Sequence, residues 1–129
     1  MARDHRKLEA FHIAHELAIL MYESTSQFPP EERYGLRTQL RRAAVSIPTN
    51  LVEGSARASE GDYLRFIDIA FASTREVNYL ISLARRLGYM DDSAADKLDV
   101  LGRRIQAALS ALQAGLRRKS RTGSKPLSP

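Results

Sequence analysis

The sequence predicts an all-α fold, an up-down-up-down antiparallel four-helix bundle. Four stretches carry apolar residues at spacings of three and four, and the alternation typical of strands does not persist beyond a few residues. Short breaks with proline or glycine separate these stretches. Only 7 of the 129 residues are glycine and 5 are proline, which disfavours a turn-rich β fold. Helices of similar length joined by short loops pack most simply as an up-down bundle.

The first helix is expected over residues 7–27. Glu9, Glu16 and Glu23 recur every seven residues and mark its solvent face. Apolar residues cover more than one remaining face, which indicates two neighbours, one of them from another subunit. The break at Phe28-Pro29-Pro30 ends this helix, because proline disfavours helical geometry in the preceding residue. The expected buried face comprises Leu8, Phe11, Ala14, Leu17, Ala18, Met21 and Tyr22.

The second helix is expected to begin at Glu31 or Tyr34 and to end near Glu53, before Gly54. Pro48 lies inside its apolar pattern. Proline removes one helical donor and crowds the carbonyl four residues earlier, so a kink is expected between Ala44 and Pro48. The core stripe is expected to comprise Leu36, Leu40, Ala43, Ile47 and Leu51.

The third and fourth helices are expected over residues 60–87 and over residues 91–116, the fourth beginning at Asp91 or Ser93. Ser59 is a suitable N-cap for the third helix, and Gly88 marks its end. Acidic residues stand at the start of both helices and basic residues follow the last, as helix dipoles favour.

The charge distribution divides the chain into a bundle over residues 1–116 and a basic tail over residues 117–129. The first part carries 15 Lys and Arg and 15 Asp and Glu, so the whole net charge of +5 lies in the second. Its Ser, Gly and Pro content predicts disorder, and its charge attracts polyanions. The alternative is a solubilising end or a remnant of cloning. The tail cations are Arg117, Arg118, Lys119, Arg121 and Lys125.

Several function classes find no support in the sequence. The absence of cysteine excludes disulfides, thiol nucleophiles and thiolate metal sites. Phosphate-loop, dinucleotide and nucleophile-elbow motifs are missing, and no apolar run has the length of a membrane helix. The first residues lead into a helix with Glu9 and Glu16 and do not form a secretory signal. We therefore expect a cytoplasmic protein without cofactor, metal or membrane partner.

Three histidines, His5, His12 and His15, lie near or on the first helix. Glu9 and His12 have the Glu-x-x-His spacing of di-iron bundles, but a di-iron site needs a second such motif, and neither Glu53 nor Glu76 provides it. Two histidines are too few for a structural metal site. We interpret all three as surface or interface residues.

A polar row follows one side of the second helix, and two polar residues stand one turn apart on the third. One interpretation is a ligand or catalytic pocket. The preferred interpretation is a structural polar network around the kink at Pro48, where a freed carbonyl needs a donor. The residues of this network are Gln39, Ser46, Asn50, Glu53, Ser73 and Glu76.

Arginines form a stripe on the second helix. Arg33, Arg37 and Arg41 are spaced by four residues and share one face, with Arg42 beside them. Arginine suits bidentate contact with phosphate, which predicts nucleic-acid binding by this stripe together with Arg117, Arg118, Lys119 and Arg121. The alternative is salt bridging to glutamates of the first helix or of a neighbouring subunit. Aromatic residues are scarce on the stripe, so base stacking is not indicated there.

One long run is specific enough to indicate a family. Supporting segments are Ala14-His15-Glu16-Leu17, Glu32-Arg33-Tyr34-Gly35-Leu36 and Tyr63-Leu64-Arg65-Phe66. The run is Gln39-Leu40-Arg41-Arg42-Ala43-Ala44-Val45-Ser46-Ile47-Pro48-Thr49-Asn50-Leu51-Val52-Glu53-Gly54. With this run and these segments, the chain resembles the 23S rRNA intervening sequence proteins over residues 8–115.

The resemblance implies an up-down bundle that assembles as a ring-like homopentamer without enzymatic activity. A related branch, the accessory proteins of diversity-generating retroelements, resembles a scaffold that binds RNA and reverse transcriptase. Our leading hypothesis is a non-enzymatic oligomeric scaffold that binds nucleic acid, with RNA favoured over DNA. The alternative is a protein–protein adaptor ring with no nucleic-acid role. A third hypothesis is a small hydrolase built on Glu53 and Glu76.

Overall fold

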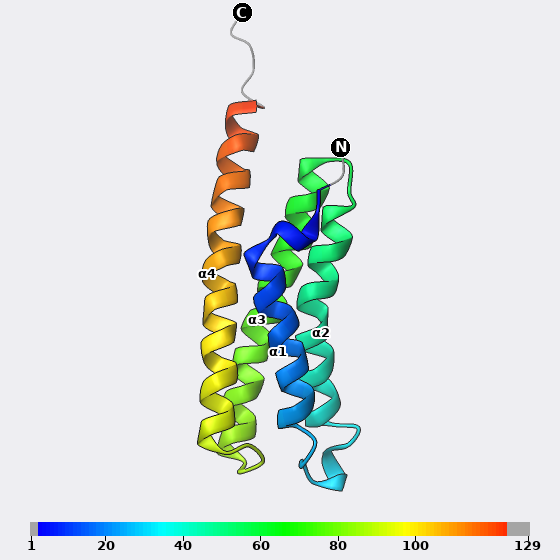
Figure 1. Ribbon diagram of the computed structural model, residues 1–129, viewed down its shortest axis with the longest axis vertical. Helices are drawn as coiled ribbons and strands as arrows, with labels where there is room; N and C mark the ends of the chain where they lie inside the picture. The colour runs from blue at the N-terminus through cyan, green and yellow to red at the C-terminus, as the bar shows by residue number, and fades with distance from the viewer. Residues whose placement is uncertain (1–2, 124–129) are drawn as a thin grey trace, which may run out of the picture.

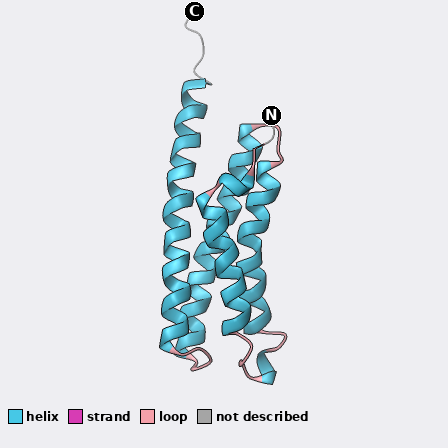
Figure 2. Cartoon of the chain, in the orientation of Figure 1, coloured by secondary structure: helices cyan, strands magenta, loops and turns pink. Residues whose placement is uncertain are grey.

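The computed structural model describes the backbone of residues 3–123 and the side chains of residues 3–119. Four long helices run alternately up and down (Figure 1), and the described residues contain no strand (Figure 2). They are α1 (Glu9–Ser24), α2 (Leu36–Ser55), α3 (Glu60–Arg86) and α4 (Asp92–Gly123). Short 3-10 turns, η1 (His5–Lys7) and η2 (Pro30–Glu32), precede α1 and α2. The predicted all-α four-helix fold is confirmed.

The helices are arranged cyclically, because each packs on its neighbours in the chain and α4 closes against α1. The core stripe predicted for the second helix is buried throughout. Burial of each large aliphatic side chain contributes roughly 1.5–3 kcal/mol, so this core supplies most of the driving force for folding. Fully buried side chains come from all four helices and include Leu17, Met21, Leu40, Ile47, Leu51, Ile67, Val77, Leu98, Ile105 and Leu109.

α2 begins at Leu36, later than either start that the sequence suggested. The preceding residues form the turn η2, and the Glu32 carboxylate accepts a hydrogen bond of 2.9 Å from the Leu36 backbone N–H. This contact satisfies one of the N–H groups that a helix start leaves without a partner. Tyr89, after α3, donates its hydroxyl to the other Glu32 oxygen at 3.3 Å and ties the two loops together.

Pro48 lies inside α2, which continues through it to Ser55. The predicted kink is not confirmed. Two side chains one turn further on donate to backbone carbonyls in this stretch. The Thr49 hydroxyl bonds the Val45 carbonyl at 2.8 Å, and the Asn50 amide bonds the Ser46 carbonyl at 2.7 Å.

α4 extends beyond Leu116, its predicted end, and reaches Gly123. Its last turns are tied to α3, because Arg117 pairs with Asp68 at 3.0 Å and Lys119 with Glu60 at 2.7 Å. Arginine and lysine are also good helix formers, and their charge suits a helix C-terminus. The basic segment therefore begins as helix. The disorder predicted for residues 117–129 is therefore wrong for residues 117–123, which are helical. Residues 124–129, which include Lys125, lie outside the described residues.

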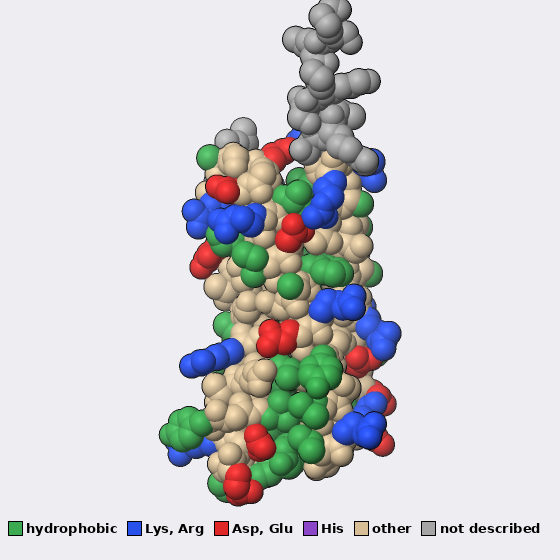
Figure 3. Space-filling view, turned by 180° about the vertical axis from the view of Figure 1, so that it is seen from behind, with side chains coloured by type: hydrophobic (Ala, Val, Ile, Leu, Met, Phe, Trp, Pro, Cys, Tyr) green, Lys and Arg blue, Asp and Glu red, His purple; other side chains and the backbone are tan. Residues whose placement is uncertain are grey.

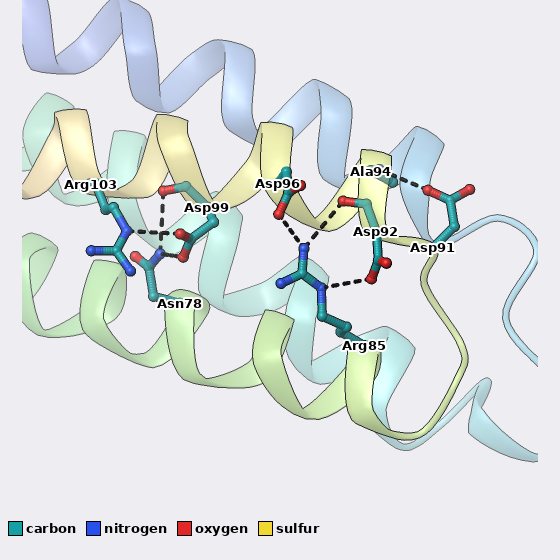
Figure 4. Close-up of polar contacts among 8 residues, drawn as sticks. All are labelled: Asn78, Arg85, Asp91, Asp92, Ala94, Asp96, Asp99 and Arg103. Carbon is teal, nitrogen blue, oxygen red and sulfur yellow. Dashed lines mark hydrogen bonds and ion pairs between the residues drawn. The ribbon is translucent and has the colours of Figure 1, made fainter.

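Polar contacts fix the register of α3 against α4 (Figure 4). The Asn78 amide donates to the Asp99 carboxylate at 2.6 Å, and Arg103 donates to the other Asp99 oxygen at 2.7 Å. Near the α3–α4 loop, Arg85 pairs with both Asp92 and Asp96. Within the described part of the chain, no helix is long and apolar enough to cross a membrane.

Candidate nucleic-acid interface

The surface of α2 carries an unbalanced positive charge. Residues 33–50 contain four arginines and no lysine or acidic residue. None of the four is ion-paired with a carboxylate of the described residues. Glutamates of α1 therefore do not neutralise the stripe within the chain. By contrast, Arg85, Arg103 and Arg117 are all ion-paired elsewhere on the bundle.

Arg41 differs from the other arginines because it joins α2 to the end of α1. Its Nε donates to the Thr25 hydroxyl at 2.8 Å, and its terminal nitrogen donates to the Tyr22 carbonyl at 3.1 Å. The guanidinium also lies 4.5 Å from the centroid of the Tyr22 ring. Burial, and secondarily the like charge of Arg37, lower the pKa of Arg41, although arginine stays charged near neutral pH. Arg41 therefore acts first as a C-terminal cap for α1.

Arg33, Arg37 and Arg42 are the arginines of the stripe that remain available to a ligand. Arg33 precedes α2, and its guanidinium lies 5.5 Å from the centroid of the exposed Tyr34 ring. Arg37 is half-buried, and Arg42 is exposed near the middle of the charged segment. No hydrogen bond holds these three guanidinium groups to the described residues, so their donors can reach an anion.

Two adjoining hollows flank α2. A hollow of about 570 Å³ is lined by residues that include Arg41, Arg42, Thr49 and Asn50. A second, of about 380 Å³, lies toward α3 and is lined by Arg42, Gln39, Glu76 and others. The two hollows share Thr38, Arg42 and Ser46. Arg42 thus stands between two concave surfaces that also offer hydroxyl and amide groups.

The structure divides the predicted polar network into two parts. The Ser46 and Ser73 hydroxyls are 2.9 Å apart across α2 and α3, and Asn50 donates to the Ser46 hydroxyl at 3.0 Å. These three side chains are half-buried and bonded to one another. Gln39, Glu53 and Glu76 are exposed, and no side-chain hydrogen bond links them to the group within the described residues.

Glu53 and Glu76 do not form a catalytic pair. The contact between Ser46 and Ser73 sets the register of the antiparallel helices. Glu53 lies seven residues beyond Ser46, and Glu76 lies three residues beyond Ser73 in the opposite direction. At 1.5 Å per residue, this places the two carboxylates about 15 Å apart along the bundle. The arrangement gives no support to the hydrolase hypothesis.

The cations at the end of the chain lie far from the α2 arginines. The last turns of α4 and the first turn of α2 are at opposite ends of the bundle (Figure 1). Arg117 and Lys119 are engaged by Asp68 and Glu60 of α3. Arg118 is exposed, and the side chain of Arg121 lies outside the described side chains. The residues that the sequence grouped as one nucleic-acid set therefore occupy two separate regions.

The histidines surround Phe11 near the start of α1. The ring centroids of His5, His12 and His15 lie 4.7, 5.5 and 6.1 Å from that of Phe11. His12 Nε2 also lies 2.6 Å from the Arg6 carbonyl oxygen. Over the part of the chain that the structure describes, no three His, Cys, Asp or Glu side chains are grouped so as to hold a metal.

Sequence reasoning missed the exposure of Tyr22. Its spacing placed it on the buried face of the first helix, but its relative exposure is 48% and it lines the 570 Å³ hollow beside Arg41. A signal was present in the sequence, because residues 17–22 are all apolar and so cover more than one face of the helix. Such a continuous apolar stretch necessarily exposes some of its members.

Comparisons with known proteins agree with this architecture. A solved structure from Bacteroides thetaiotaomicron VPI-5482, described as a protein with unknown function from the S23 ribosomal protein family, superposes with a TM-score of 0.75. It is 19% identical and covers 81% of this chain and 95% of its own, which shows the shared fold. No curated protein matches the chain. The family model described as 23S rRNA-intervening sequence protein matches residues 6–111. The chain therefore belongs to the family of 23S rRNA-intervening sequence proteins.

Proposed function

We propose that this protein is a non-enzymatic scaffold that binds RNA through the arginine-bearing surface of α2. The observation that carries the proposal is the segment of residues 33–50, with four arginines, no acidic residue and no ion pair to the described carboxylates. Unneutralised arginines attract phosphate and bind it through paired N–H donors. The preference for RNA over DNA rests on the family's description, which refers to rRNA.

A homo-oligomer would strengthen such binding, because several copies of a weak site act together at high effective concentration. Apolar surface is available away from the α2 arginines. A hollow of about 450 Å³ between α1 and α4 is lined by Leu20, Val100 and Leu101, and Val100 is 55% exposed. Hydrophobic side chains also gather on the lower part of the face seen in Figure 3. We propose that these surfaces join subunits in the cytoplasm, as a homopentamer by family resemblance.

The proposal is tested by fluorescence anisotropy with a structured RNA and the full chain. Arg42→Gln removes the most central available arginine of α2. We expect it to weaken binding about tenfold, the size of one charge-assisted contact. Arg104→Gln is the matched control, because it removes one exposed charge from α4, across the bundle from α2. Equal affinities for the two variants would contradict the proposal.

The adaptor hypothesis rests on the same apolar hollow between α1 and α4, which would then bind a different protein in place of another subunit. This hypothesis predicts that binding of the protein partner responds little to salt. It also predicts that the full chain has no affinity for RNA at physiological salt. Affinity capture with the wild-type chain and with Val100→Asp separates the two. Loss of a protein partner in V100D, with RNA binding absent in both chains, would favour the adaptor.

A further inference from the structure

A further hollow continues the α2 surface toward α1. It has a volume of about 440 Å³, and its lining includes His15, Ile19 and Pro48. Tyr22 and Val45 line both this hollow and the 570 Å³ hollow that contains Arg42. We name the combined surface the Tyr22 groove. One half of the groove is apolar, and the other half offers guanidinium, hydroxyl and amide groups.

Tyr22 stands where the two halves meet, and its ring is held in place from one side. The Arg41 guanidinium lies 4.5 Å from the ring centroid and is itself anchored by the Thr25 hydroxyl and the Tyr22 carbonyl. Since 48% of Tyr22 remains exposed, part of the ring is open to a ligand. A fixed aromatic ring binds a flat partner without paying much conformational entropy.

The two halves of the groove match the two parts of a nucleotide. Arg42, Thr49 and Asn50 offer donors for phosphate and sugar oxygens in the polar half. Ile19 and Pro48 provide apolar surface beside the Tyr22 ring. The carboxylate that lines the apolar half, Glu23, disfavours phosphate there and so sets the orientation. A duplex keeps its bases stacked inside, so the match concerns an unpaired nucleotide.

We propose that the Tyr22 groove binds an unpaired nucleotide of RNA, with the base against the Tyr22 ring and the phosphate at Arg42. This inference rests on the proposed function and adds the class of ligand to it. Stacking of bases on aromatic side chains is tolerant of base identity. The groove therefore selects single-stranded segments, such as loops and bulges, without selecting a particular base.

The test compares a single-stranded RNA oligonucleotide with an abasic sugar–phosphate chain of the same length, using the full protein. Tyr22→Leu keeps an apolar side chain beside the Arg41 guanidinium but removes the ring. We expect it to weaken binding of the oligonucleotide about tenfold and to leave binding of the abasic chain unchanged. Tyr79→Leu is the matched control, because Tyr79 is 64% exposed and lies on α3, outside the groove. This substitution is expected to leave both affinities unchanged.

A second variant guards against a folding defect in Tyr22→Leu. Ile19 is 50% exposed, so Ile19→Ser changes the apolar half of the groove at little cost to the core. It is expected to weaken oligonucleotide binding as well, with unchanged binding of the abasic chain. Sedimentation velocity on each variant reports the assembly state. A change in oligomer mass in Y22L or I19S would overturn the inference, because the groove would then be an interface between subunits.

The outcomes separate this inference from the proposed function. If Arg42→Gln lowers the affinity for both ligands but Tyr22→Leu lowers it for neither, the α2 surface binds phosphate and the nucleotide site is refuted. If the wild-type chain binds neither ligand, the proposed function itself fails. An equal loss of affinity for both ligands in Y22L also contradicts base stacking, because the abasic chain has no base that could stack on Tyr22.

Discussion

Replacing Gly102 with alanine is expected to destabilise the protein, although alanine is the better helix former. Gly102 is buried in α4, where that helix passes the Asn78 side chain of α3. A Cβ at this position would overlap Asn78 Oδ1 and lie 2.9 Å from its Nδ2. Displacing the Asn78 amide breaks its hydrogen bonds, because it donates to Asp99 at 2.6 Å and accepts from Gln106 at 2.7 Å.

The magnitude follows from these contacts. Alanine gains about 1 kcal/mol of helix propensity over glycine. Moving the Asn78 side chain breaks its hydrogen bond to the charged Asp99, which contributes roughly 1.5–3 kcal/mol. It also breaks the neutral hydrogen bond from Gln106, which contributes roughly 0.5–1.5 kcal/mol. We therefore expect Gly102→Ala to lower the free energy of unfolding by about 1–3.5 kcal/mol. Urea denaturation followed by circular dichroism measures this quantity.

A second glycine of the same helix provides the control. A Cβ on Gly115 meets nothing closer than an Arg118 nitrogen at 3.9 Å, so Gly115→Ala is expected to stabilise the protein by up to about 1 kcal/mol. Stabilisation by both alanines would refute the reasoning. Asn78→Ala should also make Gly102→Ala less harmful, because the overlapping amide is then gone.

Three further predictions concern other contacts. Arg41→Ala should lower the free energy of unfolding, measured in urea, by roughly 1.5–3 kcal/mol. Arg41→Lys should restore little of this loss, because an ammonium group cannot bond both the Thr25 hydroxyl and the Tyr22 carbonyl as the guanidinium does. Leu98→Ala leaves a cavity in the core and should cost about 2–5 kcal/mol by the same assay. Burial raises the pKa of Asp99, but hydrogen bonds from Arg103 and Asn78 outweigh it and hold the pKa below its ordinary value of 3.8. The resulting stability is complete above that value and lost as the pH falls through the lowered pKa, so Asp99→Asn should flatten the acid limb of a pH–stability curve.

The fold could be predicted from the sequence because helical periodicity reports directly on burial. Leu36, Leu40 and Ile47 follow the spacing of one helix face, and the structure buries all of them. Helix ends were less predictable, since they depend on contacts distant in the chain. The Glu32 carboxylate sets the start of α2, and the ion pair from Arg117 to Asp68 accompanies the extension of α4.

The candidate site could be predicted in composition but not in arrangement. The arginine spacing on α2 is visible in the sequence, but the capping role of Arg41 depends on Thr25, 16 residues away. The polar row follows one helix face, yet Ser73 of α3 decides which of its members are bonded. Exposure of Tyr22 likewise depends on how α1 leans on α2. Such features arise from pairs of helices, which a single-helix pattern does not describe.

The central claim is that the α2 arginines bind RNA phosphates, and the salt dependence of binding tests it most directly. Of the four arginines of the α2 stripe, Arg33, Arg37 and Arg42 have no ion pair or side-chain hydrogen bond within the described residues. Each contact with single-stranded RNA adds roughly 0.7 to the slope of log K against log salt concentration. The triple variant R33Q/R37Q/R42Q should therefore reduce the slope by about 2 per subunit. An unchanged slope, with intact folding, would contradict the claim.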